Sequence, residues 1–211
     1  MAVPREDELR ILLSRVLKAV NASKYTLYAY FYIVWLVPAG ASSILGIVLP
    51  AQLAAWVSPV FWAAATTLIL YSERRVASRI AALSHAEGRW LALGWVVSFA
   101  FGLAAALLLE AAGLLSRYTA AATGFTTALA LGTSFVAAHA ARSEGRIYTH
   151  SLPTALILWL CLPLVATAST PLKAWFTASA SLMVSYGLAA ALYLYSAINM
   201  VAEERLREDD R

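Results

Sequence analysis

Residues 90–109 read WLALGWVVSFAFGLAAALLL, twenty consecutive positions without a charged side chain. An α-helix rises about 1.5 Å per residue, so this segment is about 30 Å long, the thickness of the hydrocarbon core of a bilayer. Backbone N–H and C=O groups must bond to one another inside lipid, and the segment lacks the period-two alternation of a barrel strand. The stretch therefore predicts a transmembrane helix.

Five further segments have the same apolar character. The chain of 211 residues is 61% hydrophobic and 13% charged, with a mean hydropathy of +0.70, which exceeds what a soluble domain of this size buries. The predicted spans are residues 25–49, 53–71, 90–109, 119–140, 152–168 and 174–200. We expect an all-α integral membrane protein, a six-transmembrane-helix bundle made of three hairpins. The fifth span is short and contains Pro153 and Pro163, and omitting it gives a five-span alternative with the C-terminus on the other side.

The positive charges indicate how these spans are oriented. Fourteen of the sixteen Lys and Arg residues lie in the two terminal segments or in the gaps that follow the second and fourth predicted spans. Only Arg117 and Lys173 lie in the other gaps. Short cytoplasmic loops are enriched in Lys and Arg. We therefore predict a multi-pass protein of the cell membrane with both termini in the cytoplasm. The fourteen are Arg5, Arg10, Arg15, Lys18, Lys24, Arg74, Arg75, Arg79, Arg89, Arg142, Arg146, Arg205, Arg207 and Arg211.

Residues 1–24 and 201–211 lie outside the predicted spans. The first of these segments begins with Pro4 and three acidic residues, and its apolar residues recur at helical spacing, so it predicts a cytoplasmic amphipathic helix. Two interpretations stay open for this helix: it lies on the lipid headgroups, or it docks a partner protein. The charged segment 201–211 is predicted to be a solvated tail. The residues that recur at this spacing are Leu9, Leu12, Leu13, Val16, Leu17 and Val20.

Several chemistries are excluded by what the spans contain. An ionisable group at the middle of a bilayer costs at least about 2.5–3.5 kcal/mol, and every charge here lies at a span end, in a loop or in a tail. Proton-driven pumps, voltage sensors and carboxylate-bound metal sites need charges at that depth, so we expect none of these functions. A single Cys161 excludes an internal disulfide and a cysteine cluster for metal. Gly132-Thr133-Ser134 resembles the Gly-x-Ser of rhomboid intramembrane proteases, but those enzymes use a His on the sixth span and none is present there. We expect no enzyme activity, no catalytic residue, no metal and no cofactor.

Small residues form stripes on the third and fourth predicted spans. Small residues four positions apart allow helix backbones to approach closely. We predict that these two spans pack as a tight hairpin. The residues that define the stripes are Gly94, Ser98 and Gly102 on one span and Gly124 and Gly132 on the other.

Aromatic residues crowd the first half of the span 25–49, before Pro38 interrupts the helical pattern. Pro38 removes one helical hydrogen bond near the middle of the membrane, and many transporters bind solutes beside a broken helix at that depth. The sixth span supplies further polar groups that face this depth. The candidate ligand-binding residues are Tyr32, Trp35, Pro38, Tyr186, Tyr193 and Asn199.

Two functions fit this pattern. The first is a membrane subunit or carrier related to transport of a neutral or amphipathic solute, and the topology is similar to that of the substrate-capture subunits of energy-coupling-factor vitamin transporters. The alternative is an accessory or scaffold protein that recruits a partner through its cytoplasmic helices. The expected partner is the lipid bilayer. A membrane or cytoplasmic protein partner and a homo-oligomer both stay open, and nothing in the sequence indicates binding to nucleic acid. Two asparagines, one glutamine and three methionines, with thirteen arginines against three lysines, suit a thermophilic source; membrane composition and a GC-rich genome would give a similar picture.

Overall fold

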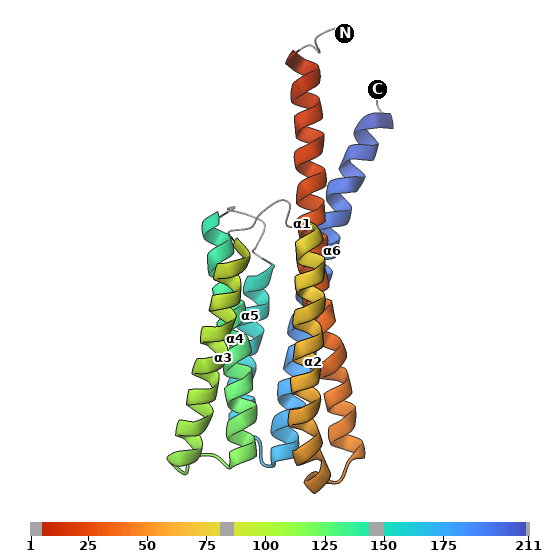
Figure 1. Cartoon of the computed structure of the whole chain (residues 1–211). Helices are drawn as coiled ribbons and strands as arrows, with labels where there is room; N and C mark the ends of the chain where they lie inside the picture. The colour runs from red at the N-terminus through yellow and green to blue at the C-terminus, as the bar shows by residue number, and fades with distance from the viewer. Residues whose placement is uncertain (1–5, 81–86, 144–149, 210–211) are drawn as a thin grey trace.

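The computed structural model of the protein describes residues 6–80, 87–143 and 150–209 (Figure 1). These ranges contain six helices and no strand, so the prediction of an all-helical protein is confirmed for the described residues. Each predicted apolar segment falls on a different helix. The helices are α1 Glu6–Val48, α2 Ala51–Ile80, α3 Glu87–Ala111, α4 Arg117–Ser143, α5 Ser151–Ala166 and α6 Pro171–Asp209.

Four of the helices are long and apolar enough to cross a membrane. In the described residues these stretches are Leu9–Val48, Leu93–Ala111, Arg117–Ala138 and Pro171–Ala202. The apolar part of α2 covers Val60–Ile69. The 16 residues of α5 give a length of about 24 Å, which is shorter than a typical hydrocarbon core. Length and composition thus give four candidate crossings, consistent with a membrane protein.

The outward faces of these helices are apolar. On α3, Phe101, Leu103 and Leu108 are each more than half exposed, and on α5 Leu160 and Leu164 are exposed to a similar degree. Contiguous exposed side chains of this size are unfavourable in water, but they match the hydrocarbon tails of lipids. The surface composition therefore agrees with a lipid environment.

The helices pack as a chain of neighbours. The most extensive contacts join α1 to α6 and α3 to α4, and α4, α5 and α6 connect these two pairs, whereas α2 rests mainly on α1 (Figure 1). Ala29 and Ala39 on α1 and Ala189 on α6 are completely buried, because their small side chains let the two long helices approach closely. α1 begins and α6 ends at the same end of the bundle (Figure 1).

The turns at the opposite end follow ordinary capping chemistry. Gly113, after the end of α3, has φ of 68°, a left-handed conformation that glycine adopts without strain, and the N–H of Leu114 bonds to the carbonyl of Leu109 at 3.1 Å. Ser116 accepts a hydrogen bond from the N–H of Thr119 at 3.4 Å and caps α4. Thr170 caps α6 in the same way, directly before Pro171.

Helix α1 is continuous over its 43 residues. The predicted boundary between residues 24 and 25 lies inside this helix, and the break expected at Pro38 is not present, because α1 remains helical on both sides of the proline. Pro38 is buried, and packing against neighbouring helices allows a transmembrane helix to tolerate a missing hydrogen bond. At about 1.5 Å per residue α1 is about 64 Å long, and its first turns extend beyond the ends of α2 to α5 (Figure 1).

Candidate functional site

The aromatic residues predicted on α1 and α6 lie together in the core. Tyr193 is fully buried, and its ring stacks on the rings of Tyr32 and Tyr28 at centroid distances of 5.7 and 5.5 Å. The ring of Tyr186 meets Tyr32 edge-on at 4.9 Å. Aromatic pairs of this geometry contribute about 0.5–1.5 kcal/mol each beyond the area that they bury. The cluster therefore joins α1 to α6 firmly.

Ser151, the first residue of α5, connects the hydroxyl groups of this cluster. Its Oγ lies 2.8 Å from the hydroxyl of Tyr32 and 2.7 Å from the hydroxyl of Tyr193. Ser151 is completely buried, so all three hydroxyls share hydrogen bonds inside the protein. Three helices thus meet at one serine. The sequence alone gives no sign of this role of Ser151, because one serine at the start of an apolar segment forms no pattern.

His150 forms a second layer beside the tyrosines. Its Nε2 lies 2.7 Å from the Oγ of Ser196 on α6, and its ring meets the ring of Tyr193 edge-on at 5.1 Å and lies 5.9 Å from that of Tyr25. Partial burial lowers the pKa of His150 below its usual value, because the charged imidazolium loses water contacts. This contact is not predicted from the sequence either, since His150 precedes the predicted span.

The other predicted ligand-binding residues lie at the edge of this cluster or apart from it. Trp35 is half-buried against the core, and Pro38 is buried within an unbroken helix. Asn199 is half-buried, and no hydrogen bond joins it to the tyrosines in the described part of the chain. The hydroxyl oxygen of Tyr186 lies 3.5 Å from the Oγ1 of Thr133, at the limit of a hydrogen bond. These contacts support a structural role for the tyrosine hydroxyls.

The glycine stripes of α3 and α4 face one another. A Cβ added to Gly102 would meet the carbonyl oxygen of Gly124, and it would lie 2.7 Å from the Cβ of Ala128. The neighbouring glycines are covered by rings: Phe135 lies over Gly94, and Trp95 lies over Gly132. Ser98 is buried on the same side, and its hydroxyl donates to the carbonyl of Gly94 at 2.7 Å. The structure brings all five predicted residues into the contact between α3 and α4.

The Gly-x-Ser segment of α4 serves as a packing element. Ser134 donates to the carbonyl of Ala130 at 2.7 Å and accepts a hydrogen bond from Nε1 of Trp159 on α5 at 3.1 Å. The histidine of the same helix, His139, follows Ser134 by five residues, and its side chain lies outside the described residues. Among the residues that are described, no group of three or more His, Cys, Asp or Glu side chains is placed to hold a metal ion. The observed contacts of Ser134 are those of a residue that links α4 to α5.

No model of a known protein family, no curated protein and no solved structure matches this chain significantly.

Proposed function

We propose that this protein is a six-span membrane anchor with both termini in the cytoplasm, and that the first turns of α1 recruit an acidic amphipathic helix of a partner protein. The 14 to 2 division of positive residues supports the orientation. The crossings by α2 and α5 in this proposal rest on their apolar stretches and on the alternation of the charges. The observation that carries the docking role is the exposed apolar stripe on the projecting part of α1.

The stripe consists of five residues at helical spacing. Their exposed fractions range from 49% for Leu9 to 61% for Leu13, although each is a large aliphatic side chain. Exposed leucines at this spacing are the pattern with which one helix packs on another. The five residues are Leu9, Leu12, Leu13, Val16 and Leu17.

The continuity of α1 favours a protein over the lipid surface as the occupant. A helix that lies on the headgroups has to turn away from a helix that crosses the bilayer, which requires a break between them. α1 has no break between Leu9 and Tyr25, and its first turns project beyond α2 to α5 (Figure 1). The stretch Leu9–Val48 is about 60 Å long, twice the thickness of a hydrocarbon core, and the proposal places residues 25–49 in the bilayer. The stripe then points into water unless another protein covers it.

The charges favour a partner of opposite sign over a second copy. α1 begins with the acidic residues 6–8, and between residues 9 and 24, where the stripe lies, it carries four positive residues and no acidic one. Two copies of this segment side by side would bring like charges together, whereas an acidic amphipathic helix gives both apolar contact and attraction. The four residues are Arg10, Arg15, Lys18 and Lys24.

A photocrosslinking residue placed in the full-length protein tests this proposal in membranes of the native organism. Crosslinkers at Leu13 and Leu17 should give adducts with another protein, and the crosslinked peptide should come from an acidic amphipathic helix. The same crosslinker at Ile11, which is 39% exposed on the opposite face of α1, is the matched control. Adducts with lipid alone, with a second copy alone, or with equal yield from Ile11 would overturn the proposal.

The carrier hypothesis remains a second proposal. The buried tyrosine hydroxyls are bonded to Ser151, so they offer it little support. An opening at the other end of α1 and α6 is the observation that favours solute binding.

A further inference from the structure

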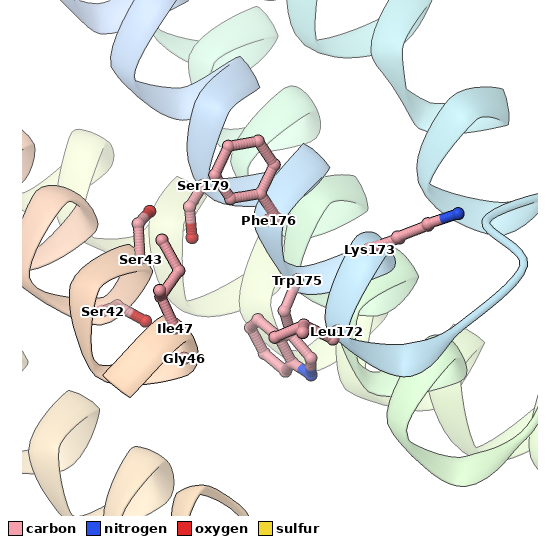
Figure 2. Close-up of a pocket in the computed structure, with 9 residues that line it drawn as sticks. All are labelled: Ser42, Ser43, Gly46, Ile47, Leu172, Lys173, Trp175, Phe176 and Ser179. Carbon is pink, nitrogen blue, oxygen red and sulfur yellow. The ribbon is translucent and has the colours of Figure 1, made fainter. Parts of the chain in front are cut away.

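A small pocket lies between the last turns of α1 and the first turns of α6 (Figure 2). Its volume is about 190 Å³, and it is partly open to the surroundings of the protein. Cavities of about 150 Å³ in other proteins bind benzene, so this pocket has room for one substituted six-membered ring. The residues that line it are Ser42, Ser43, Gly46, Ile47, Leu172, Lys173, Trp175, Phe176 and Ser179.

The three serine hydroxyls of the pocket differ in their hydrogen bonds. Ser42 accepts a bond from Nε1 of Trp62 at 3.0 Å, and Ser43 donates to the carbonyl of Ala39 at 3.0 Å. Ser179 is only 3% exposed, and its hydroxyl has no hydrogen bond within the described part of the chain. Ser181 and Ser185, further along the same helix, instead donate to carbonyls one turn back.

The hydroxyl of Ser179 is available to bond a ligand in the opening. A buried hydroxyl without a partner costs free energy, and native proteins rarely leave one unsatisfied. Ser43 and Ser179 lie on the sides of α1 and α6 that face each other across the opening (Figure 2). A ligand oxygen in the opening would accept a bond from Ser179, and a ligand hydroxyl would also find an acceptor in Ser43, whose own proton is used by Ala39.

The pocket offers no charge to a ligand. Lys173 is its one charged lining residue, and the ammonium group points away from the other lining side chains toward Ser169, at 3.2 Å from that hydroxyl (Figure 2). The remaining surface is made mostly of aliphatic and aromatic groups, including Ile47, Leu172 and Phe176. A neutral, mainly apolar molecule is the chemistry that such a surface accepts.

We propose that this pocket binds a small neutral alcohol or phenol, with the ring between α1 and α6 and the oxygen bonded to Ser179. This site is independent of the docking surface on α1, because the two lie at opposite ends of that helix. A negative result for one of these two sites therefore does not contradict the proposal for the other.

Binding of benzyl alcohol to the full-length protein in lipid nanodiscs tests the proposal. Ligand-observed NMR with empty nanodiscs as the blank separates a saturable site from partition into lipid. Benzyl alcohol should bind saturably and toluene, which lacks the hydroxyl, should bind about 2- to 12-fold more weakly. Ser179→Ala should weaken the binding of benzyl alcohol by a similar factor and leave the affinity for toluene unchanged.

Two glycine variants of α1 form a matched pair for the same measurement. A Cβ at Gly46 would lie 3.6 Å from Leu172, an ordinary contact, so Gly46→Leu should fill the pocket without disturbing the helices and abolish binding. Gly40 has no atom within 4 Å of an added Cβ, so Gly40→Leu should bind normally. Binding that matches empty nanodiscs, or that survives Gly46→Leu and Ser179→Ala unchanged, would overturn the proposal.

Discussion

Gly102 and Gly124 lie against each other where α3 crosses α4, and a Cβ on either residue would collide with the carbonyl oxygen or Cβ of the opposite helix. The contact therefore predicts that larger side chains at these two positions destabilise the protein. Gly102→Leu or Gly124→Leu should lower the free energy of unfolding by at least about 1–3 kcal/mol, because the helices must separate to admit the side chain. Leu at the exposed Ala104 of α3 is the control and should change little. Thermal unfolding in detergent measures all three, and equal tolerance would remove the case for a tight hairpin.

The bonds of Ser151 to Tyr32 and Tyr193 are expected to stabilise the bundle. Tyr32→Phe and Tyr193→Phe should each lower the free energy of unfolding by about 0.5–1.5 kcal/mol. Ser151→Ala should cost about 1–3 kcal/mol, because it leaves both hydroxyls without their shared partner. Tyr195→Phe is the control, since Tyr195 is 67% exposed on the same helix. Unchanged stability in all the cluster variants would show that these hydrogen bonds are not structural.

Burial of His150 predicts a stability that depends on pH. The pKa of His150 is lower in the folded protein than the usual value of about 6.5 in an unfolded chain. As the pH falls through 6.5 the unfolded chain takes up the proton first, so stability should fall until the folded protein is protonated as well. Unfolding curves between pH 8 and 5 measure this decline.

The variant His150→Gln separates this residue from His85 and His139. Its unfolding midpoint should fall less steeply than that of the parent protein over the same pH range, since the group that titrates is gone. Parallel curves for the two proteins would show that His150 does not cause the decline.

Cysteine labelling tests the proposed orientation. In a Cys161→Ala background, cysteines at Ser84 and Ser143 should be protected in intact cells, whereas cysteines at Ser116 and Ser169 should react with an impermeant reagent. The structure places Ser116 and Ser169 in the turns opposite the start of α1. Labelling of position 143 from outside would exclude the six-span arrangement.

Sequence patterns anticipated the parts of this protein that depend on many residues at once. Apolar length predicted a helix around residues 90–109, and spacing in steps of four placed Gly102 and Gly124 on facing stripes. Single residues whose role depends on packing were not anticipated. Pro38 predicts a break in α1, but the helix continues through it, and Pro38 and Ala39 are both buried in the bundle. Ser151 and Ser179 differ only in what surrounds them, and sequence alone gives no sign of that difference.

The central claim, that the first turns of α1 stand in water with an exposed apolar stripe, is tested most directly by a spin label at position 13. The label is placed on the purified protein in nanodiscs, again with Cys161→Ala, and its accessibility to a water-soluble nickel chelate and to oxygen is measured. Labels at Ser169, which is exposed in the turn between α5 and α6, and at Leu160, which is 74% exposed on α5, provide the aqueous and lipid references. The account predicts that position 13 resembles Ser169, with high access to the nickel chelate. Access to oxygen like that of Leu160 would place the stripe in the bilayer, and low access to both reagents would place it against a second copy; either result would contradict the account.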